Sequence, residues 1–254
     1  MQFTDPNLRR EIFSWYSPSL GMEMPIVRYG HWGHGLLLIP TASGDFLEAE
    51  RMFLIKSIEH LLFAGRVQVW CIESINKHAW MNDGLPVHVK AHNQARFSSY
   101  IENEVVPHIR RSMQSDSVRI GVTGASFGAF YAANAFFRRP DLFDALIAMS
   151  GFYDLDAQGF LHGYRDDNVY FNNPLSYIPN MSDHGVLETL RHSQIHILTG
   201  RGAHERPVYS EHLSQALWAK GVPNNLDLWG HDVPHDWPTW RHMLPYYLNE
   251  RMGW

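Results

Sequence analysis

Residues 118–140 read VRIGVTGASFGAFYAANAFFRRP, and this stretch decides how the chain folds. Val118 to Val122 is a short run of the kind that forms buried strands. Small residues follow in Gly124-Ala125-Ser126-Phe127-Gly128, and an alanine-rich segment that favours a helix then runs to Pro140. The stretch therefore predicts a strand, a sharp turn with Ser126 at its centre, and a helix.

Similar short apolar runs recur along the chain, separated by longer segments that suit helices. They span residues 35–39, 67–72, 146–149, 195–198 and 226–229. This alternation predicts a mostly parallel central sheet with helices on both faces. Residues 12–27 read as two strands around a turn at Gly21, which predicts an antiparallel N-terminal start to the sheet.

Apolar residues spaced three or four apart predict two helices between these strands. The first has an apolar face from Met52 to Leu62 and is expected to stop at Gly65. The second runs from Phe97 to Ile109, with a kink or an early end at Pro107. Residues 73–92 and 152–184 fit neither pattern. We expect them to be lid-like insertions at the rim of a site, in one domain that spans residues 1–254.

Composition narrows the class of protein. Of 254 residues, 45% are hydrophobic and 19% charged, which excludes a disordered chain. A net charge of −5 without a basic block argues against nucleic-acid binding. Residues 1–10 are polar and no apolar run approaches the roughly 18 residues of a membrane helix, so we expect a cytoplasmic protein that does not bind membranes. The single cysteine, Cys71, lies in a strand-like run and is expected in the core.

Ser126 has the surroundings that a serine nucleophile needs. A serine at a tight strand-to-helix turn requires small neighbours, which Gly124 and Gly128 provide. The start of the following helix directs free N–H groups and the positive end of its dipole toward a developing oxyanion. Taken alone, this pentapeptide is an ordinary glycine turn about as often as it is a nucleophile elbow. With its flanking strand and helix, it is typical of the α/β-hydrolase fold.

A serine hydroxyl needs a base, and in this fold the catalytic residues follow the order Ser, acid, His. His231, His235 and His242 come after the last strand-like run. His242 falls within a predicted C-terminal helix over residues 239–248. His231 and His235 both lie in the loop before that helix. We predict that His235 is the base because it directly precedes the helix, with Asp236 as the N-cap, and we assign His231 to the substrate side of the site.

The acid is expected just after residues 195–198, where Glu205 is the only carboxylate before residue 206. We choose Glu205, and the competing interpretation is a surface glutamate paired with Arg201 or Arg206. Asp154, after the preceding strand, is the alternative acid, and Asp227 and Asp232 are weaker choices. Without a carboxylate to fix its tautomer, the histidine would be a poor base, and the reaction rate would fall by orders of magnitude.

The oxyanion hole is expected to combine the N–H of Phe127 with one from the loop after the third strand, residues 40–46. Ala42 is the predicted second donor, and Thr41 and Ser43 are alternatives that we also expect to contact substrate. A plain turn is the competing interpretation of this loop.

With these residues in place, the chain resembles the putative esterase family of α/β-hydrolases, which includes esterase D, feruloyl esterases and the mycolyltransferases of the antigen 85 group. The resemblance covers nearly the whole chain. It rests on residues 39–46, 124–128, 149–151 and 230–241. The last stretch is the most specific, because a His-Asp-Trp followed by Trp-Arg implies that His235 is the base. The chain departs from the family pattern at the acid, where residues 201–204 separate Glu205 from the glycine after the strand.

Three functions fit these residues. We favour a serine esterase that cleaves small-molecule carboxylic esters through an acyl-serine intermediate. The alternatives are an acyltransferase on the same machinery and a non-catalytic relative that uses the pocket for binding. Sixteen histidines suggest a metal, but neither His31 with His34 nor His231 with His235 has a convincing third ligand, so we expect no metal or cofactor. Aromatic residues in the lid-like insertions suit an apolar acyl group, although core packing explains them almost as well. They are also compatible with a homodimer.

Overall fold

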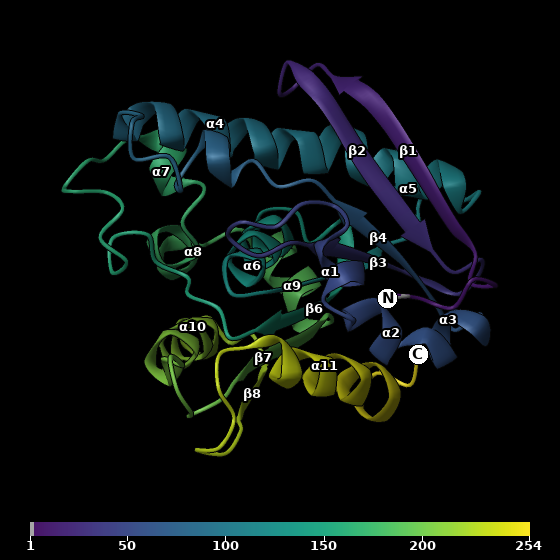
Figure 1. The fold of residues 1–254 in the computed structure, drawn as a ribbon. Helices are drawn as coiled ribbons and strands as arrows, with labels where there is room; N and C mark the ends of the chain where they lie inside the picture. Colours follow the sequence, from purple (N-terminus) through teal and green to yellow (C-terminus); the bar gives the residue numbers. More distant parts are fainter. Residues whose placement is uncertain (1–2) are drawn as a thin grey trace.

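Eight strands form one sheet in the part of the chain that the structure, a computed structural model, describes: residues 3–254. Met1 and Gln2 of the predicted domain lie outside the described residues. The strand order is β1-β2-β4-β3-β5-β6-β7-β8 (Figure 1). β1 pairs with β2 and β2 with β4 in antiparallel fashion, and the remaining neighbours are parallel. The predicted α/β-hydrolase fold with antiparallel N-terminal strands is confirmed.

The strands lie close to the predicted runs. Their bounds are β1 Arg10–Ser17, β2 Met22–Tyr29, β3 His34–Ile39, β4 Val67–Ile72, β5 Ile120–Ala125, β6 Phe143–Met149, β7 Gln194–Thr199 and β8 Asn225–Leu228. β5 begins two residues later than predicted, and the Val118 carbonyl accepts a hydrogen bond from Arg110 Nε at 2.7 Å instead of joining the sheet. Cys71 is buried in β4, as predicted, and burial raises the pKa of its thiol.

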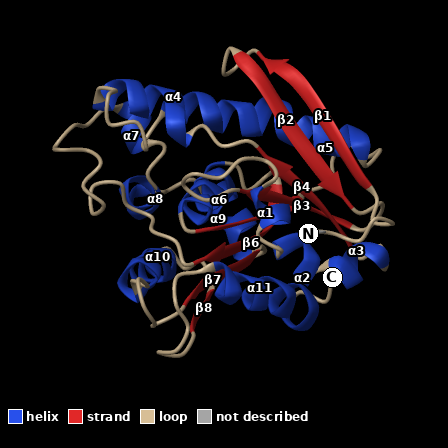
Figure 2. Ribbon diagram, viewed as in Figure 1, coloured by secondary structure: helices blue, strands red, loops and turns tan. Residues whose placement is uncertain are grey.

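Helices cover both faces of this sheet (Figure 1 and Figure 2). One face packs against α4 Val87–Tyr100, α5 Val106–Ser112, α6 Phe127–Arg138, α9 His184–Arg191 and α10 Pro207–Ala219. The other face packs against α1 Glu48–Arg51, α2 Leu54–Ser57, α3 Glu59–Phe63 and α11 Trp237–Tyr246. Each face therefore has its own hydrophobic core.

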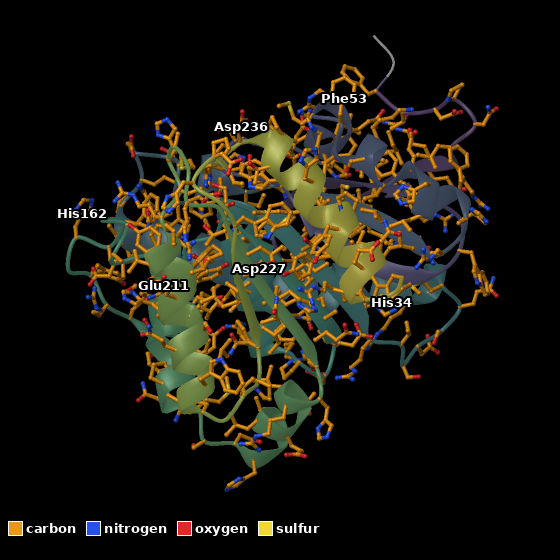
Figure 3. The ribbon with its side chains drawn as sticks, turned by 90° about the horizontal axis from the view of Figure 1, so that it is seen from below. His34, Phe53, His162, Glu211, Asp227 and Asp236 are labelled. Atoms are coloured by element: carbon orange, nitrogen blue, oxygen red, sulfur yellow. The ribbon has the colours of Figure 1, made fainter. Side chains whose placement is uncertain are left out.

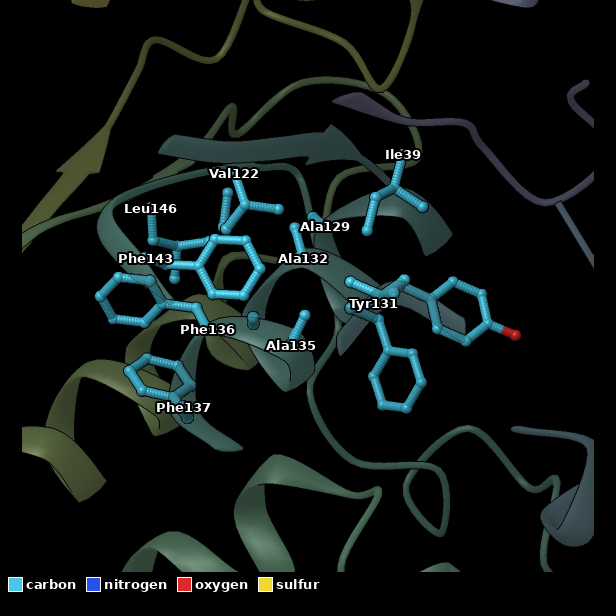
Figure 4. Packing of buried hydrophobic residues seen from close by; sticks show 14 of the residues in the cluster. Ile39, Val122, Ala129, Tyr131, Ala132, Ala135, Phe136, Phe137, Phe143 and Leu146 are labelled. Atoms are coloured by element: carbon cyan, nitrogen blue, oxygen red, sulfur yellow. The ribbon is translucent and has the colours of Figure 1, made fainter. Parts of the chain in front are cut away.

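The helix that follows Ser126, α6, is buried from Phe127 to Phe137. Its alanines, among them Ala129 and Ala132, belong to one packed cluster with Ile39 of β3 and Val122 of β5 (Figure 4). Small side chains on this helix let it approach the sheet closely. The N-terminus of α6 is thereby held against the centre of the sheet, directly beside Ser126.

The first predicted helix, with its apolar face from Met52 to Leu62, is two short helices, α2 and α3, and α1 lies just before it. Phe53, with a left-handed φ of 61°, separates α1 from α2, and Ile58 separates α2 from α3. A left-handed phenylalanine has no sequence signature, which is why the apolar spacing suggested one continuous helix. Gly65 follows α3 with a φ of +64°, in agreement with its predicted role as a stop.

The second predicted helix is longer than expected. It starts as α4 at Val87, passes through a π-helical turn over Ile101–Val105 and continues as α5. Pro107 does not end it, so the early end that was one of the two expected outcomes does not occur. The proline lies in the first turn of α5, just after the wide π-helical turn, where its missing N–H is tolerated.

Both predicted lid-like insertions contain more regular structure than expected. Residues 73–92 include a 3-10 turn at Asn76–His78 and the first turn of α4. Residues 152–184 include α7 Asp167–Tyr170, α8 Pro174–Tyr177 and a 3-10 turn at Ile178–Asn180. Among their aromatic residues, Trp80, Tyr153 and Tyr177 are buried in the core, Phe152 and Phe160 line a cavity, and Phe171 is exposed.

Candidate active site

Ser126 occupies the sharp turn between β5 and α6. Its backbone has a φ of 55° and a ψ of −121°, a strained conformation for a residue with a side chain. A Cβ added to Gly124 would come within 2.4 Å of Gly128, and one added to Gly128 would lie 2.3 Å from the Ile39 carbonyl oxygen. These two positions therefore require glycine because the backbone segments lie too close together for a side chain, and not because of a positive φ.

Glu205 is the carboxylate that contacts the His235 ring. Glu205 Oε2 and His235 Nδ1 are 3.4 Å apart, and the glutamate side chain is only 1% exposed. Asp154, the alternative acid, instead accepts hydrogen bonds from Asn173 Nδ2 and the Asp156 N–H, both at 3.0 Å. The geometry thus places Glu205, and not Asp154, beside the histidine.

Two hydroxyl groups complete the surroundings of Glu205. Ser150 Oγ donates to Oε1, and Thr199 Oγ1 donates to Oε2 at 3.0 Å. Ser150 Oγ itself accepts a hydrogen bond from Trp240 Nε1 at 3.0 Å. Burial alone would raise the pKa of Glu205, but the hydrogen bonds from His235, Ser150 and Thr199 outweigh burial and hold this pKa below its usual value. Glu205 is therefore a stable anion facing the histidine.

The loops that carry Glu205 and His235 are interlocked. A Cβ added to Gly200 would lie 2.0 Å from the Val233 carbonyl oxygen, and one added to Gly202 would lie 2.6 Å from the same atom. The Gly202 N–H donates to that oxygen at 2.9 Å, and the His235 N–H donates to the Ala203 carbonyl at 2.9 Å. Residues 201–204, the departure from the family pattern, thus form the turn that lies against the histidine loop.

Ser126, Glu205 and His235 all line one cavity of about 250 Å³. Its apolar wall consists of Met81, Phe127, Phe152 and Phe160, and its polar wall of Gln158, His204, Arg206 and Tyr209. Within the described residues, the Ser126 hydroxyl and the His235 ring face this common space without a hydrogen bond between them. Such contacts in free enzymes are often long and shorten when substrate binds.

The loop over residues 40–46 lies beside the elbow, since Gly128 approaches the carbonyl groups of Ile39 and Pro40. The Thr41 N–H and hydroxyl both donate to Glu48, at 2.9 and 2.7 Å. Burial raises the pKa of Glu48 despite these two bonds, and nearby Asp45 adds to the increase. Glu48 therefore engages both donors of Thr41, one of the alternative oxyanion donors.

Ala42 and Ser43 line a neighbouring cavity of about 380 Å³. Met81 lines both this cavity and the one that contains Ser126, so the two spaces adjoin. No hydrogen bond within the described chain occupies the Ala42 N–H. This amide therefore has no acceptor within the described chain, and Ala42 lines the neighbouring cavity rather than the one that contains Ser126.

The remaining predicted site residues lie elsewhere. His231, Asp232 and His242 are exposed, and none of them lines the Ser126 cavity. Asp227 on β8 accepts hydrogen bonds from Tyr247 Oη at 2.8 Å and Trp229 Nε1 at 3.0 Å. Figure 3 shows Asp227 well separated from Asp236, which begins α11. These weaker acid candidates do not contact His235.

Sequence reasoning missed the supporting residues of the site. Ser150 and Trp240 lie in two of the stretches that carry the family resemblance, so their positions were visible but their roles were not. Glu48 has no recognisable motif. Its role follows only from its contacts with Thr41 and from Gly44, where an added Cβ would lie 2.2 Å from Glu48 Oε2.

The described residues hold neither a cluster of metal ligands nor a membrane-spanning helix. In residues 3–254, no three His, Cys, Asp or Glu side chains converge on a metal-sized site. His34, labelled in Figure 3, bonds to Asp144 Oδ1 at 3.1 Å and stacks on Trp254. Over the same range, no helix has the length and apolar character needed to span a bilayer.

A serine at the elbow of an α/β sheet, with a histidine and a buried glutamate on the same cavity, defines the class of serine hydrolases. The model of the family described as "Putative esterase" matches residues 76–250, more than half of the chain. The chain belongs to this esterase family and is a carboxylic-ester hydrolase.

Solved structures share its fold at low sequence identity. A ferulic acid esterase is 18% identical, with a TM-score of 0.72 and coverage of 95% of this chain and 96% of that one. S-formylglutathione hydrolase from Staphylococcus aureus is 16% identical, with a TM-score of 0.69 and coverage of 96% and 98%. MPT51 from Mycobacterium tuberculosis is 14% identical, with a TM-score of 0.71 and coverage of 96% and 98%. Among curated protein sequences, none matches the chain.

Proposed function

We propose that the protein hydrolyses small-molecule carboxylic esters through an acyl intermediate on Ser126, with His235 as base and Glu205 as the acid that orients it. The observation that carries this proposal is the 3.4 Å contact between Glu205 and His235 on the cavity that also contains Ser126. The proposal treats the chain as one catalytic domain, with residues 73–92 and 152–184 contributing to the rim of the site.

In the first half-reaction, His235 Nε2 takes the Ser126 hydroxyl proton while Oγ attacks the ester carbonyl carbon. The negative charge that forms on the carbonyl oxygen is stabilised by the N–H groups of Phe127 and Ala42. The engagement of Thr41 by Glu48 supports the choice of Ala42 as second donor. The intermediate then collapses, and the alcohol leaves with the proton that the histidine returns.

In the second half-reaction, His235 takes a proton from water, whose oxygen attacks the acyl carbon. The tetrahedral intermediate collapses, Ser126 Oγ leaves and recovers the proton from the histidine, and the carboxylic acid is released. Glu205 accepts a hydrogen bond from Nδ1 throughout and stabilises the imidazolium without becoming protonated. Its lowered pKa is consistent with that role.

Hydrolysis of 4-nitrophenyl butanoate, combined with labelling by a fluorophosphonate, tests this proposal. We expect turnover and a covalent adduct for the wild-type protein, and neither for Ser126→Ala. Added alcohols separate hydrolysis from acyl transfer, because a transferase would form the new ester even when the alcohol is dilute. A folded wild-type protein that neither reacts with the probe nor turns over would favour a non-catalytic binding role instead.

A further inference from the structure

The polar wall of the Ser126 cavity carries one fixed positive charge, the guanidinium of Arg206. His204 and Arg206 flank Glu205 in the chain, and both line the cavity. Glu205 is the only acidic residue that lines it, and this carboxylate already accepts hydrogen bonds from Ser150, Thr199 and His235. An incoming ligand therefore meets the Arg206 guanidinium without a competing free carboxylate.

Arg206 has no carboxylate partner. Across residues 3–254, none of the ion pairs formed by Asp and Glu side chains includes its guanidinium. The residue is the N-cap of α10, a helix of 13 residues, so the positive end of the helix dipole lies at the same place. A guanidinium can donate two parallel hydrogen bonds to one carboxylate, which makes it a selective ligand for that group.

Gln158 lines the same cavity from the segment that follows β6. Its Nε2 is buried and has no hydrogen-bond partner within the described chain. A buried donor without an acceptor is unfavourable, so turning this amide toward a ligand oxygen in the cavity would be favoured. Gln158 and the exposed Arg206 thus line one cavity from two separate segments.

We propose that the preferred substrates are esters that carry a carboxylate, bound through Arg206 and Gln158 while Phe127, Phe152 and Phe160 contact the apolar part. This inference rests on the proposed function of Ser126. The protein as a whole has a net charge of −5, so its overall charge does not attract anions. Selection of an anionic substrate would therefore depend on the local arginine.

Two pairs of esters test the proposal and locate the charged group. On the acyl side, 4-nitrophenyl hydrogen adipate is compared with its neutral methyl ester. On the alcohol side, 4-carboxyphenyl butanoate is compared with 4-carbamoylphenyl butanoate. We expect kcat/KM to favour the carboxylate by roughly tenfold or more in one of the two pairs, as a charge-assisted hydrogen bond implies. The preference should narrow as salt is added.

Variants assign this preference to Arg206. Arg206→Gln should lower the ratio of kcat/KM for charged over neutral ester roughly tenfold, and Arg206→Glu should reverse it. Arg201→Gln is the matched control, because Arg201 is an exposed arginine in the same loop that does not line the cavity. This control should leave the ratio unchanged.

Three outcomes would overturn the inference. Equal kcat/KM values within both pairs would show that no carboxylate is selected. A preference that survives Arg206→Gln, or that falls equally with Arg201→Gln, would show that Arg206 is not its source. Failure of every ester together with failure of Ser126 to react with a fluorophosphonate would reject the hydrolase proposal itself, whereas neutral-ester turnover without charge selection would reject the specificity alone.

Discussion

Two glutamates support different parts of the site, and their surroundings shift their pKa values in opposite directions. Glu205, on the histidine side, is almost fully buried, yet hydrogen bonds from three side chains lower its pKa. Glu48, on the side of residues 40–46, accepts two bonds from the single residue Thr41, and burial raises its pKa. The number of donors around a carboxylate, rather than burial alone, decides which form the protein favours.

This difference separates the two functions of the site. On the histidine side, the backbone at Gly200 and Gly202 packs closely against the Val233 carbonyl. This close packing limits the movement of the loops that carry Glu205 and His235. The loop over residues 40–46 is held by separate contacts with Glu48, Glu73 and Arg51, and Glu48 is the one that fixes Thr41 next to Ala42. We therefore expect changes on the histidine side to affect chemistry severely and changes at Glu48 to act more mildly, through the placement of the Ala42 N–H.

Removing the charge of Glu205 should have the largest effect. We expect Glu205→Gln to lower kcat by roughly 10³–10⁴-fold, because the histidine loses its oriented tautomer and the stabilisation of its cation. Steady-state kinetics with 4-nitrophenyl butanoate measure this. Asp154→Asn is the control and should stay near wild type. A larger loss for Asp154→Asn than for Glu205→Gln would reverse the assignment of the acid.

Removing Glu48 should have an intermediate effect. Loss of its contacts with Thr41 lets the loop shift, and loss of one oxyanion donor costs up to roughly 10²–10³-fold in kcat. We expect Glu48→Ala to lower kcat by about 10–100-fold with a smaller change in KM. Glu48→Gln, which can still accept from the Thr41 N–H, should recover most of the rate. Equal losses in the two variants would argue against a positioning role.

Ser150→Ala should have a smaller effect than either. It removes one of the donors to Glu205 and leaves Trp240 Nε1 without its acceptor, while the contact between Glu205 and His235 persists. A loss of roughly three- to tenfold in kcat and about 1–2 kcal/mol in the free energy of unfolding is expected. Trp240→Phe should reproduce part of the stability loss. An unchanged stability in Ser150→Ala would contradict the importance of this chain of hydrogen bonds.

The smallest expected effect is on the pH dependence of stability. Glu205 has a folded-state pKa below its ordinary 4.5, so its stabilisation is present above that value and is lost as the pH falls through the folded-state pKa. Glu48 has a folded-state pKa above 4.5, so its contribution is present below that value and is lost as the pH rises through the folded-state pKa.

Urea unfolding between pH 3 and pH 7 measures this contrast in Glu205→Gln and Glu48→Gln. The difference in unfolding free energy between wild type and each variant should change with pH in opposite directions. Slopes of the same sign would show that the two carboxylates do not differ as described.

The fold followed from the sequence because strands are short apolar runs and the turn at Ser126 is flanked by a strand and a helix that reinforce each other. Ser126, His235 and Glu205 were singled out by their order along the chain, and they line one cavity. The break at Phe53 and the role of Glu48 had no local signal, since both depend on how segments pack. The interlock of Gly200 and Gly202 with Val233 likewise joins two loops that are separate in sequence.

Trapping of the acyl intermediate tests the central claim most directly. The protein is mixed rapidly with 4-nitrophenyl butanoate, quenched in acid, digested and analysed by mass spectrometry. We predict one butanoyl group on the peptide that contains Ser126, formed at the rate of the initial 4-nitrophenol release and absent from Ser126→Ala. Turnover by a Ser126→Ala protein, or a butanoyl group on another residue at that rate, would contradict the account.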